Sequence, residues 1–274
     1  MASVISESAR DEILRYLRTF MANAISAIRP VSRAAHEFRP TRSSDEEGDI
    51  KPFHEALVPE GVLRTSGFER SFSTSLGTTF EEVAKIIGAE RFQESRRGFR
   101  LQVSIPRVAL DTIDGIMSDI SSDGMSGRYL DFIQSVAQAY RGDAVNRRPL
   151  TIDLYLRENE GIEHFFEMKS PKPNKDGAVG AVRKLLMAHG VRGAGPPRVN
   201  SYYAMAYNPY GDSRGLYTES VARKYLDFSN MVRIGSEFWD FVGGQGTYPE
   251  VLELYGIVGR ELGPQVWRTI TGSP

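Results

Sequence analysis

Two acids and a lysine near the middle of the chain have the residue types and the spacing that metal-assisted phosphate chemistry needs. The stretch from Pro149 to Pro173, PLTIDLYLRENEGIEHFFEMKSPKP, reads as two short strands joined by a polar turn that contains glycine. Side chains alternate between the two faces of a strand, so Glu167 and Lys169 share one face of the second strand. Pairing of the two strands can bring Asp153 to the same point.

The chemistry of this group follows from its side chains. Two carboxylates, Asp153 and Glu167, suit a hard cation such as Mg²⁺, which prefers oxygen ligands and retains several waters. The carbonyl of Met168 is a natural further oxygen ligand. Lys169 can position a water beside the cation or offset developing negative charge. The spacing therefore indicates a magnesium-dependent hydrolase that acts on phosphate esters.

An exposed hairpin decorated with cross-strand ion pairs would show a similar pattern. Phe165 and Phe166 stand next to each other in the second strand, which indicates burial on both faces. A buried carboxylate without a partner or a metal is costly, so burial favours the catalytic interpretation.

Composition places the chain among ordinary globular proteins. It has 274 residues, 41% of them hydrophobic, which is enough for one large or two modest domains. No apolar run approaches the length of a membrane span, and the first residues lack the pattern of a secretion signal, so we expect a cytoplasmic protein with no membrane partner. The chain has no cysteine, and its four histidines show no metal-ligand spacing.

Positive charge is concentrated around the proposed site although the net charge is only -1. Residues 1–90 carry 11 basic and 14 acidic side chains, whereas residues 141–200 carry 11 basic and 7 acidic ones. A locally basic cleft suits an enzyme that engages phosphates and then releases them. Sampling noise over sixty residues is the alternative.

The first third of the chain contains two predicted helices. Residues 8–28 have a helical apolar period, and the stretch 39–61 reads as a solvated loop or arm, so residues 1–60 form an N-terminal helix plus loop. A second helix is expected to begin at a cap at Thr78 or Thr79. It would carry Glu81 at the margin of its apolar face, either as an additional acid of the metal site or as a favourable charge in the first helical turn.

The rest of the chain predicts a mixed α/β core. Helices are expected around residues 110–120, 128–140 and 175–189, and a third strand at residues 201–209. The segment 90–100 is basic and either contacts phosphates or ends a helix. The last third reads as helical, with Phe238 and Trp239 in the core or at an interface. No firm boundary appears, so we predict one domain over residues 1–274, with residues 64–274 as the catalytic core and its C-terminal helical part.

Three stretches resemble the TdeIII-like type II restriction endonucleases of the PD-(D/E)xK nuclease superfamily: residues 68–88, 152–176 and 231–254. The resemblance implies a mixed central sheet flanked by helices. It also implies a magnesium-dependent DNA endonuclease that acts as a homodimer on short two-fold symmetric sites of the GGNCC kind. On matching positions it assigns Asp153, Glu167 and Lys169 to the metal and water site, with Glu81 as the acid carried by a helix. Ile152 stands where proline is usual in the superfamily motif.

Two other functions stay open at this point: a repair or recombination nuclease without sequence preference, and a non-catalytic nucleic-acid-binding module. If DNA is bound, the segment that follows the second strand is expected at its surface, through Lys172, Asn174 and Lys175, by contacts to bases or to phosphates. The sequence holds a single Glu-x-Lys triplet, so cutting both strands of a symmetric site predicts a homodimer.

Overall fold

The structure is a computed structural model that describes residues 3–28, 60–125, 127–195 and 198–271. Nearly all of the predicted loop at 39–61 lies outside these residues. The chain divides into two compact units, one formed by Met1–Arg10 with Phe80–Leu252 and the other by Asp11–Thr79 with Glu253–Pro274. Three helices continue from one unit into the other: α1 (Glu7–Ser26), α3 (Glu60–Gly88) and α9 (Thr247–Thr271).

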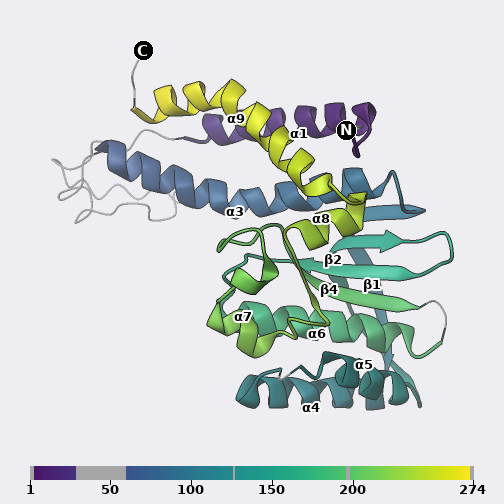
Figure 1. Cartoon of the computed structure of the whole chain (residues 1–274). Coiled ribbons are helices and arrows are strands. Elements are labelled where there is room, and N and C mark those ends of the chain that lie inside the picture. The colour runs from purple at the N-terminus through teal and green to yellow at the C-terminus, as the bar shows by residue number, and fades with distance from the viewer. Residues whose placement is uncertain (1–2, 29–59, 126, 196–197, 272–274) are drawn as a thin grey trace, which may run out of the picture. The chain divides into compact units, whose positions relative to one another are not determined.

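The first unit is built on a five-stranded mixed sheet (Figure 1), which confirms the predicted fold class. Its strands lie in chain order: β1 (Glu94–Pro106), β2 (Ala144–Arg157), β3 (Glu163–Met168), β4 (Val199–Met205) and β5 (Val232–Ile234). β1, β2 and β3 pair antiparallel, whereas β3, β4 and β5 pair parallel. β1 and β5 were not predicted, and β2 begins before the predicted start at Pro149.

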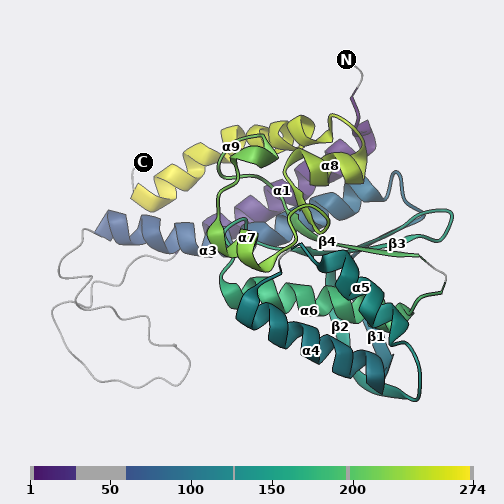
Figure 2. The same cartoon turned by 60° about the horizontal axis from the view of Figure 1, so that its bottom comes forward.

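Helices cover both faces of the sheet. α4 (Arg107–Asp123), α5 (Tyr129–Gln138) and α6 (Lys175–Arg192) lie on one side and α8 (Ser236–Gly243) on the other, as Figures 1 and 2 show. Asn174 begins α6, because its side-chain oxygen accepts the N–H of Gly177 at 2.7 Å. The short elements η2 (Arg214–Leu216) and α7 (Ser220–Tyr225) join β4 to β5. The helices predicted around residues 110–120, 128–140 and 175–189 are confirmed.

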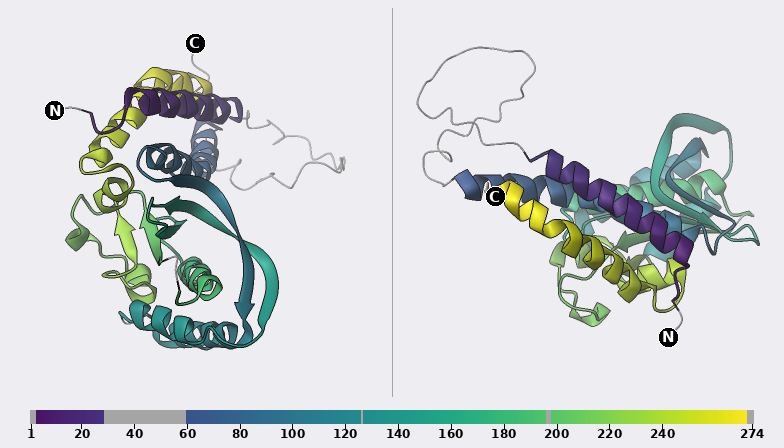
Figure 3. Two further views of the ribbon diagram at one scale, coloured as in Figure 1. Left: turned by 90° about the vertical axis from the view of Figure 1, so that its right-hand side faces the viewer. Right: turned by 90° about the horizontal axis from the view of Figure 1, so that it is seen from above.

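β1 and β2 extend beyond the rest of the sheet as a two-stranded ribbon. Figure 3 (left) shows this ribbon curving around α6, so that one of its faces is turned toward the helices. Leu101, Val103 and Ile105 of β1 lie on that face and are 2%, 3% and 0% exposed. Apolar and polar residues alternate from Arg100 to Ile105, and this alternation is the sequence signal by which β1 could have been predicted.

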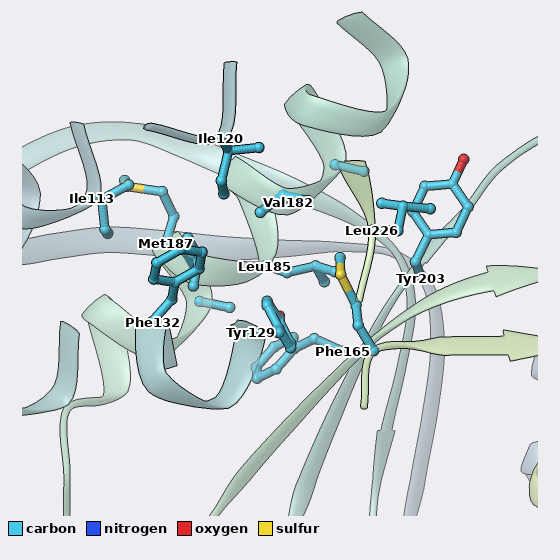
Figure 4. Close-up of a cluster of buried hydrophobic side chains, with 14 of the residues drawn as sticks. Ile113, Ile120, Tyr129, Phe132, Phe165, Val182, Leu185, Met187, Tyr203 and Leu226 are labelled. Atoms are coloured by element: carbon cyan, nitrogen blue, oxygen red, sulfur yellow. The ribbon is translucent and has the colours of Figure 1, made fainter. Parts of the chain in front are cut away.

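β3 is the most buried strand, because parallel pairing to β4 requires a crossover helix that covers the sheet. All six of its residues are buried. Phe165 packs in the hydrophobic core on the face of the sheet that α6 covers (Figure 4). Phe166 makes a T-shaped contact with Phe238 of α8 on the opposite face. Phe238 and Trp239 are 0% and 1% exposed, so they belong to the core and are not interface anchors.

The helix cap predicted at Thr78 or Thr79 is wrong, because α3 continues through both residues from Glu60. Each threonine hydroxyl instead donates back to the carbonyl three residues earlier, on Ser75 and Leu76. Thr79 also shares a hydrogen bond of 2.8 Å with the Tyr255 hydroxyl of α9. Packing within the second unit therefore outweighs the local tendency of threonine to begin a helix.

Among the described residues, no helix has both the length and the apolar composition needed to cross a bilayer.

A buried chain of hydrogen bonds couples α5, α6 and β4 and makes stability depend on pH. The Tyr129 hydroxyl lies 2.6 Å from Ser201 Oγ, which lies 2.7 Å from His189 Nε2. Burial lowers the pKa of His189 to about 4, because the core penalises the charged imidazolium. The unfolded chain regains a histidine pKa of about 6.5 and binds the proton first as the pH falls. The contribution of neutral His189 is complete above pH ~6.5 and is lost toward pH ~4.

We therefore expect the free energy of unfolding of the native protein to fall by roughly 2–3 kcal/mol more between pH 7 and pH 4.5 than that of a His189→Gln variant. Urea titrations of both proteins at the two pH values measure the difference. Parallel pH profiles would contradict the assignment.

Candidate active site

The site forms where β2 separates from β3. Their pairing runs from Arg157 opposite Glu163 to Leu154 opposite Phe166 and stops there. Asp153 is the next residue of β2, and its Oδ2 accepts the backbone N–H of Met168 at 2.9 Å. At the point where β2 and β3 stop pairing, the Asp153 side chain thus accepts the hydrogen bond that a backbone carbonyl of the neighbouring strand would otherwise accept.

Lys169 joins the two acids of the predicted cluster. Its Nζ lies 2.6 Å from Asp153 Oδ2 and 3.0 Å from Glu167 Oε2. Glu167 is fully buried, whereas the side chains of Asp153 and Lys169 are 15% and 33% exposed. The structure therefore brings the three residues to one point, with the glutamate innermost.

A second lysine, which the sequence did not indicate, reaches the same glutamate from α6. Lys184 Nζ donates to both carboxylate oxygens of Glu167, at 3.1 and 3.0 Å, and to the carbonyl of Thr151 at 3.2 Å. Two ammonium groups thus face two carboxylates. The approach of α6 to the sheet is a tertiary feature, so spacing along the chain gives no signal for Lys184.

Burial and neighbouring charges both shift the pKa values of Glu167 and Lys169. Burial raises the pKa of Glu167, and the negative charge of Asp153 raises it further, while Lys169 and Lys184 oppose the rise. Burial alone would lower the pKa of Lys169, but the charges of Glu167 and Asp153 outweigh it and raise the pKa above its ordinary value. Lys169 is therefore an ammonium at neutral pH and a hydrogen-bond donor to the carboxylates beside it.

A pocket of about 650 Å³ opens beside Asp153. It lies between the C-terminal turns of α3 and the strands β1 and β2, so a substrate can approach the aspartate from this side. Its lining consists of Glu81, Glu82, Lys85, Ser95, Arg96, Arg97, Gly98, Thr151 and Asp153.

Glu81 lines this pocket, but an arginine holds it. Arg97 Nε donates to Glu81 Oε2 at 2.9 Å. Burial raises the pKa of Glu81, while the hydrogen bond from Arg97 lowers it, and the charges of Asp153 and Lys169 act on it as well. Within the described part of the chain, no three aspartate, glutamate or histidine side chains form a metal-binding group.

The oxygen donors of the cluster fit a hard divalent cation. Asp153 and Glu167 supply carboxylates, and Met168 supplies a backbone carbonyl between Glu167 and Lys169. Both acids already share the positive charge of Lys169, so the site stabilises a cationic group between them.

The three residues predicted to bind DNA lie in the connection to α6 and at its start, and all are exposed. Lys172 Nζ stands 5.2 Å from the ring centroid of Tyr210, and Lys175 Nζ stands 5.5 Å from that of Tyr225. Asn174 uses its side-chain oxygen to cap α6. Contact of this segment with DNA stays a prediction.

The mixed sheet with this site defines a protein of the restriction-endonuclease-like class. The family model of the type II restriction endonuclease HinfI matches residues 6–259, and the chain therefore belongs to the HinfI family of type II restriction endonucleases. It is accordingly a site-specific deoxyribonuclease, and its substrate is DNA. Membership rules out the non-catalytic module and the nuclease without sequence preference.

Three type II restriction enzymes of Herpetosiphon aurantiacus are similar along nearly the whole chain. HgiEI is 37% identical over 267 residues, covering 93% of this chain and 94% of that enzyme. HgiCII is 34% identical over 275 residues, covering 97% and 99%. HgiBI is 36% identical over 265 residues, covering 93% and 94%.

The two contacts of Lys184 with Glu167 lead to a prediction about its role. Lys184→Met leaves Glu167 with one cationic partner. On the expectation that Glu167 ligates Mg²⁺, the cleavage rate at limiting Mg²⁺ should fall about 10- to 100-fold, as for residues that orient a metal ligand. Lys184→Arg should restore part of the rate, because it keeps the charge. The neighbouring Arg183 pairs with Asp114 at 2.5 Å, so Arg183→Ala is the matched control. Initial rates over a range of Mg²⁺ concentrations measure the effect, and equal rates for Lys184→Met and the native enzyme would remove Lys184 from the site.

Proposed function

We propose that Asp153, Glu167 and Lys169 form a PD-(D/E)xK catalytic centre that hydrolyses phosphodiester bonds of double-stranded DNA. One observation carries the proposal: a single ammonium, Lys169 Nζ, lies within hydrogen-bond distance of both carboxylates where the strands separate. The open pocket beside Asp153 supports it, because a phosphate of the backbone can enter there.

The cofactor that we assign to this centre is Mg²⁺, held by Asp153, Glu167 and the carbonyl of Met168. When bound, the cation polarises the phosphate and lowers the pKa of a water. The two acids supply the negative charge that retains it, and Lys184 holds the Glu167 carboxylate in place.

The other residues act through their charge and position. Lys169 can donate to the attacking water or to the phosphate oxygens as negative charge develops. Arg97 holds Glu81 at the pocket wall, from which Glu81 serves as the additional acid of the centre. Lys172, Asn174 and Lys175 are assigned to the DNA surface.

The recognised site is assigned as a short two-fold symmetric duplex of the GGNCC kind, cut by a homodimer. Support for this comes from the resemblance of three stretches to TdeIII-like enzymes and from the single Glu-x-Lys triplet in each chain. A closed dimer places one centre on each strand of a symmetric site.

Conservative variants test the centre without removing its bulk. Asp153→Asn and Glu167→Gln should cut plasmid DNA below the detection limit in Mg²⁺, because each loses a ligand charge. Lys169→Met should cut about 100- to 1000-fold more slowly, because it loses one donor to the developing charge. Asp176→Asn, an exposed acid in the first turn of α6, is the control and should cut normally. Binding to DNA in Ca²⁺ shows that each variant folds, and substantial cutting by Asp153→Asn would refute the assignment.

Oligomeric state is tested by light scattering at assay concentration, with and without cleavable DNA. We expect twice the chain mass of 30.6 kDa and a linearised plasmid as the first product. A monomer under both conditions, with nicked plasmid as the end product, would contradict both the dimer and the symmetric site.

A further inference from the structure

The outer face of the β1–β2 ribbon is polar and free of acids. Leu101, Val103 and Ile105 point into the core, whereas the residues between them are exposed. Neither 98–106 nor 144–151 contains an aspartate or a glutamate. The exposed polar residues of the two segments are Arg100, Gln102, Ser104, Asn146, Arg147, Arg148 and Thr151.

Pairing places Arg100, Ser104, Asn146 and Thr151 on one surface, whereas Arg147 stands opposite the buried Val103. In an antiparallel ladder, residues that stand opposite each other share a face. Arg100 stands opposite Thr151 and Ser104 stands opposite Asn146, with a register shift between these pairs that leaves an extra residue in β2 around Arg148. Such a bulge strengthens the local twist and turns a side chain toward a new direction.

Four side chains of this face have no polar partner among the described residues. In the part of the chain that the structure describes, Arg100, Gln102, Asn146 and Arg148 make no ion pair and no side-chain hydrogen bond. The neighbouring arginines, by contrast, form ion pairs. Arg96 pairs with Glu94, Arg97 pairs with Glu81, and Arg107 pairs with Asp111. The positive charges of Arg100 and Arg148 are therefore not compensated by an acid, whereas those of the neighbouring arginines are.

The ribbon is continuous with the catalytic pocket. Thr151 stands opposite Arg100 in the ladder and also lines the pocket together with Asp153. A duplex whose backbone enters the pocket therefore passes next to the ribbon's outer face.

We propose that this face enters the major groove and reads the recognition sequence. Arg100 and Arg148 would read the guanine edges of such a site, and the amides of Gln102 and Asn146, which both donate and accept hydrogen bonds, would contact neighbouring base edges. A two-stranded ribbon fits the major groove, and the rise from Arg100 to Ser104, about 13 Å, corresponds to about four base pairs. The inference rests on DNA as the substrate and deepens the proposed function, since it names the residues that choose the site.

The test uses the full-length protein and a pool of duplexes with eight randomised central base pairs. Cut molecules are sequenced after partial digestion in Mg²⁺, and bound molecules are sequenced after selection in Ca²⁺. For Arg100→Ala and Gln102→Ala we expect cutting of the native sequence to fall about 10- to 100-fold, and preference to relax at one base pair in each half of the site. Arg100→Lys should relax it too, because lysine keeps the charge but loses the planar fork.

Arg260→Ala is the control, since it removes one charge from an exposed arginine of α9. It should leave the selected sequence unchanged. Uniform weakening on all sequences by Arg100→Ala, with full rescue by Arg100→Lys, would make the residue a phosphate contact and overturn the proposal. Unchanged selection by every ribbon variant would overturn it as well. The Ca²⁺ selection requires no cutting, so its outcome is independent of whether Asp153 and Glu167 form the centre.

Discussion

Compensation of charge around Glu167 is the constraint on which the site depends. This carboxylate is fully buried in a strand whose six residues are all buried. A buried carboxylate is stable only with partners, and Lys169 and Lys184 supply them from the end of the same strand and from α6. Asp153 then shares Lys169, which brings the two acids together. Removing one partner leaves charge uncompensated in the core, so the four residues act as a unit.

The fold produces this arrangement by opening the sheet at one point. β2 pairs with β3 only as far as Leu154, and the next residue, Asp153, turns its side chain to the N–H of Met168. β2 then continues with β1 as a ribbon around α6 (Figure 3), while β3 continues beside β4. The same separation therefore creates the acidic cluster, the pocket beside it and the exposed ribbon, and it connects the proposed catalytic centre to the surface on which we place DNA reading.

Local patterns predicted that Asp153, Glu167 and Lys169 lie close together, but they did not predict what surrounds these residues. Strand alternation and one turn sufficed to bring Asp153 to Glu167 and Lys169, because these contacts depend on two neighbouring strands. Lys184 depends on the packing of α6 against the sheet, which spacing does not encode. Apolar and polar residues alternate clearly in β1, but its arginines led to its interpretation as a basic segment. β5 has only three residues, which is too few for a pattern. The supposed cap at Thr78 or Thr79 lies inside α3, since packing overrode a local signal.

The most direct test of a metal centre between Asp153 and Glu167 is to locate the metal itself. Fe²⁺ can replace Mg²⁺ at oxygen-ligand sites, and with ascorbate and peroxide it generates radicals that cut the polypeptide beside the bound ion. Mass spectrometry of the fragments gives the positions of the cuts. We expect cuts next to residue 153 and residues 167–168 that are suppressed by excess Mg²⁺ and absent from Asp153→Asn. Cuts confined to other parts of the chain, or cuts that Mg²⁺ does not suppress, would contradict the account.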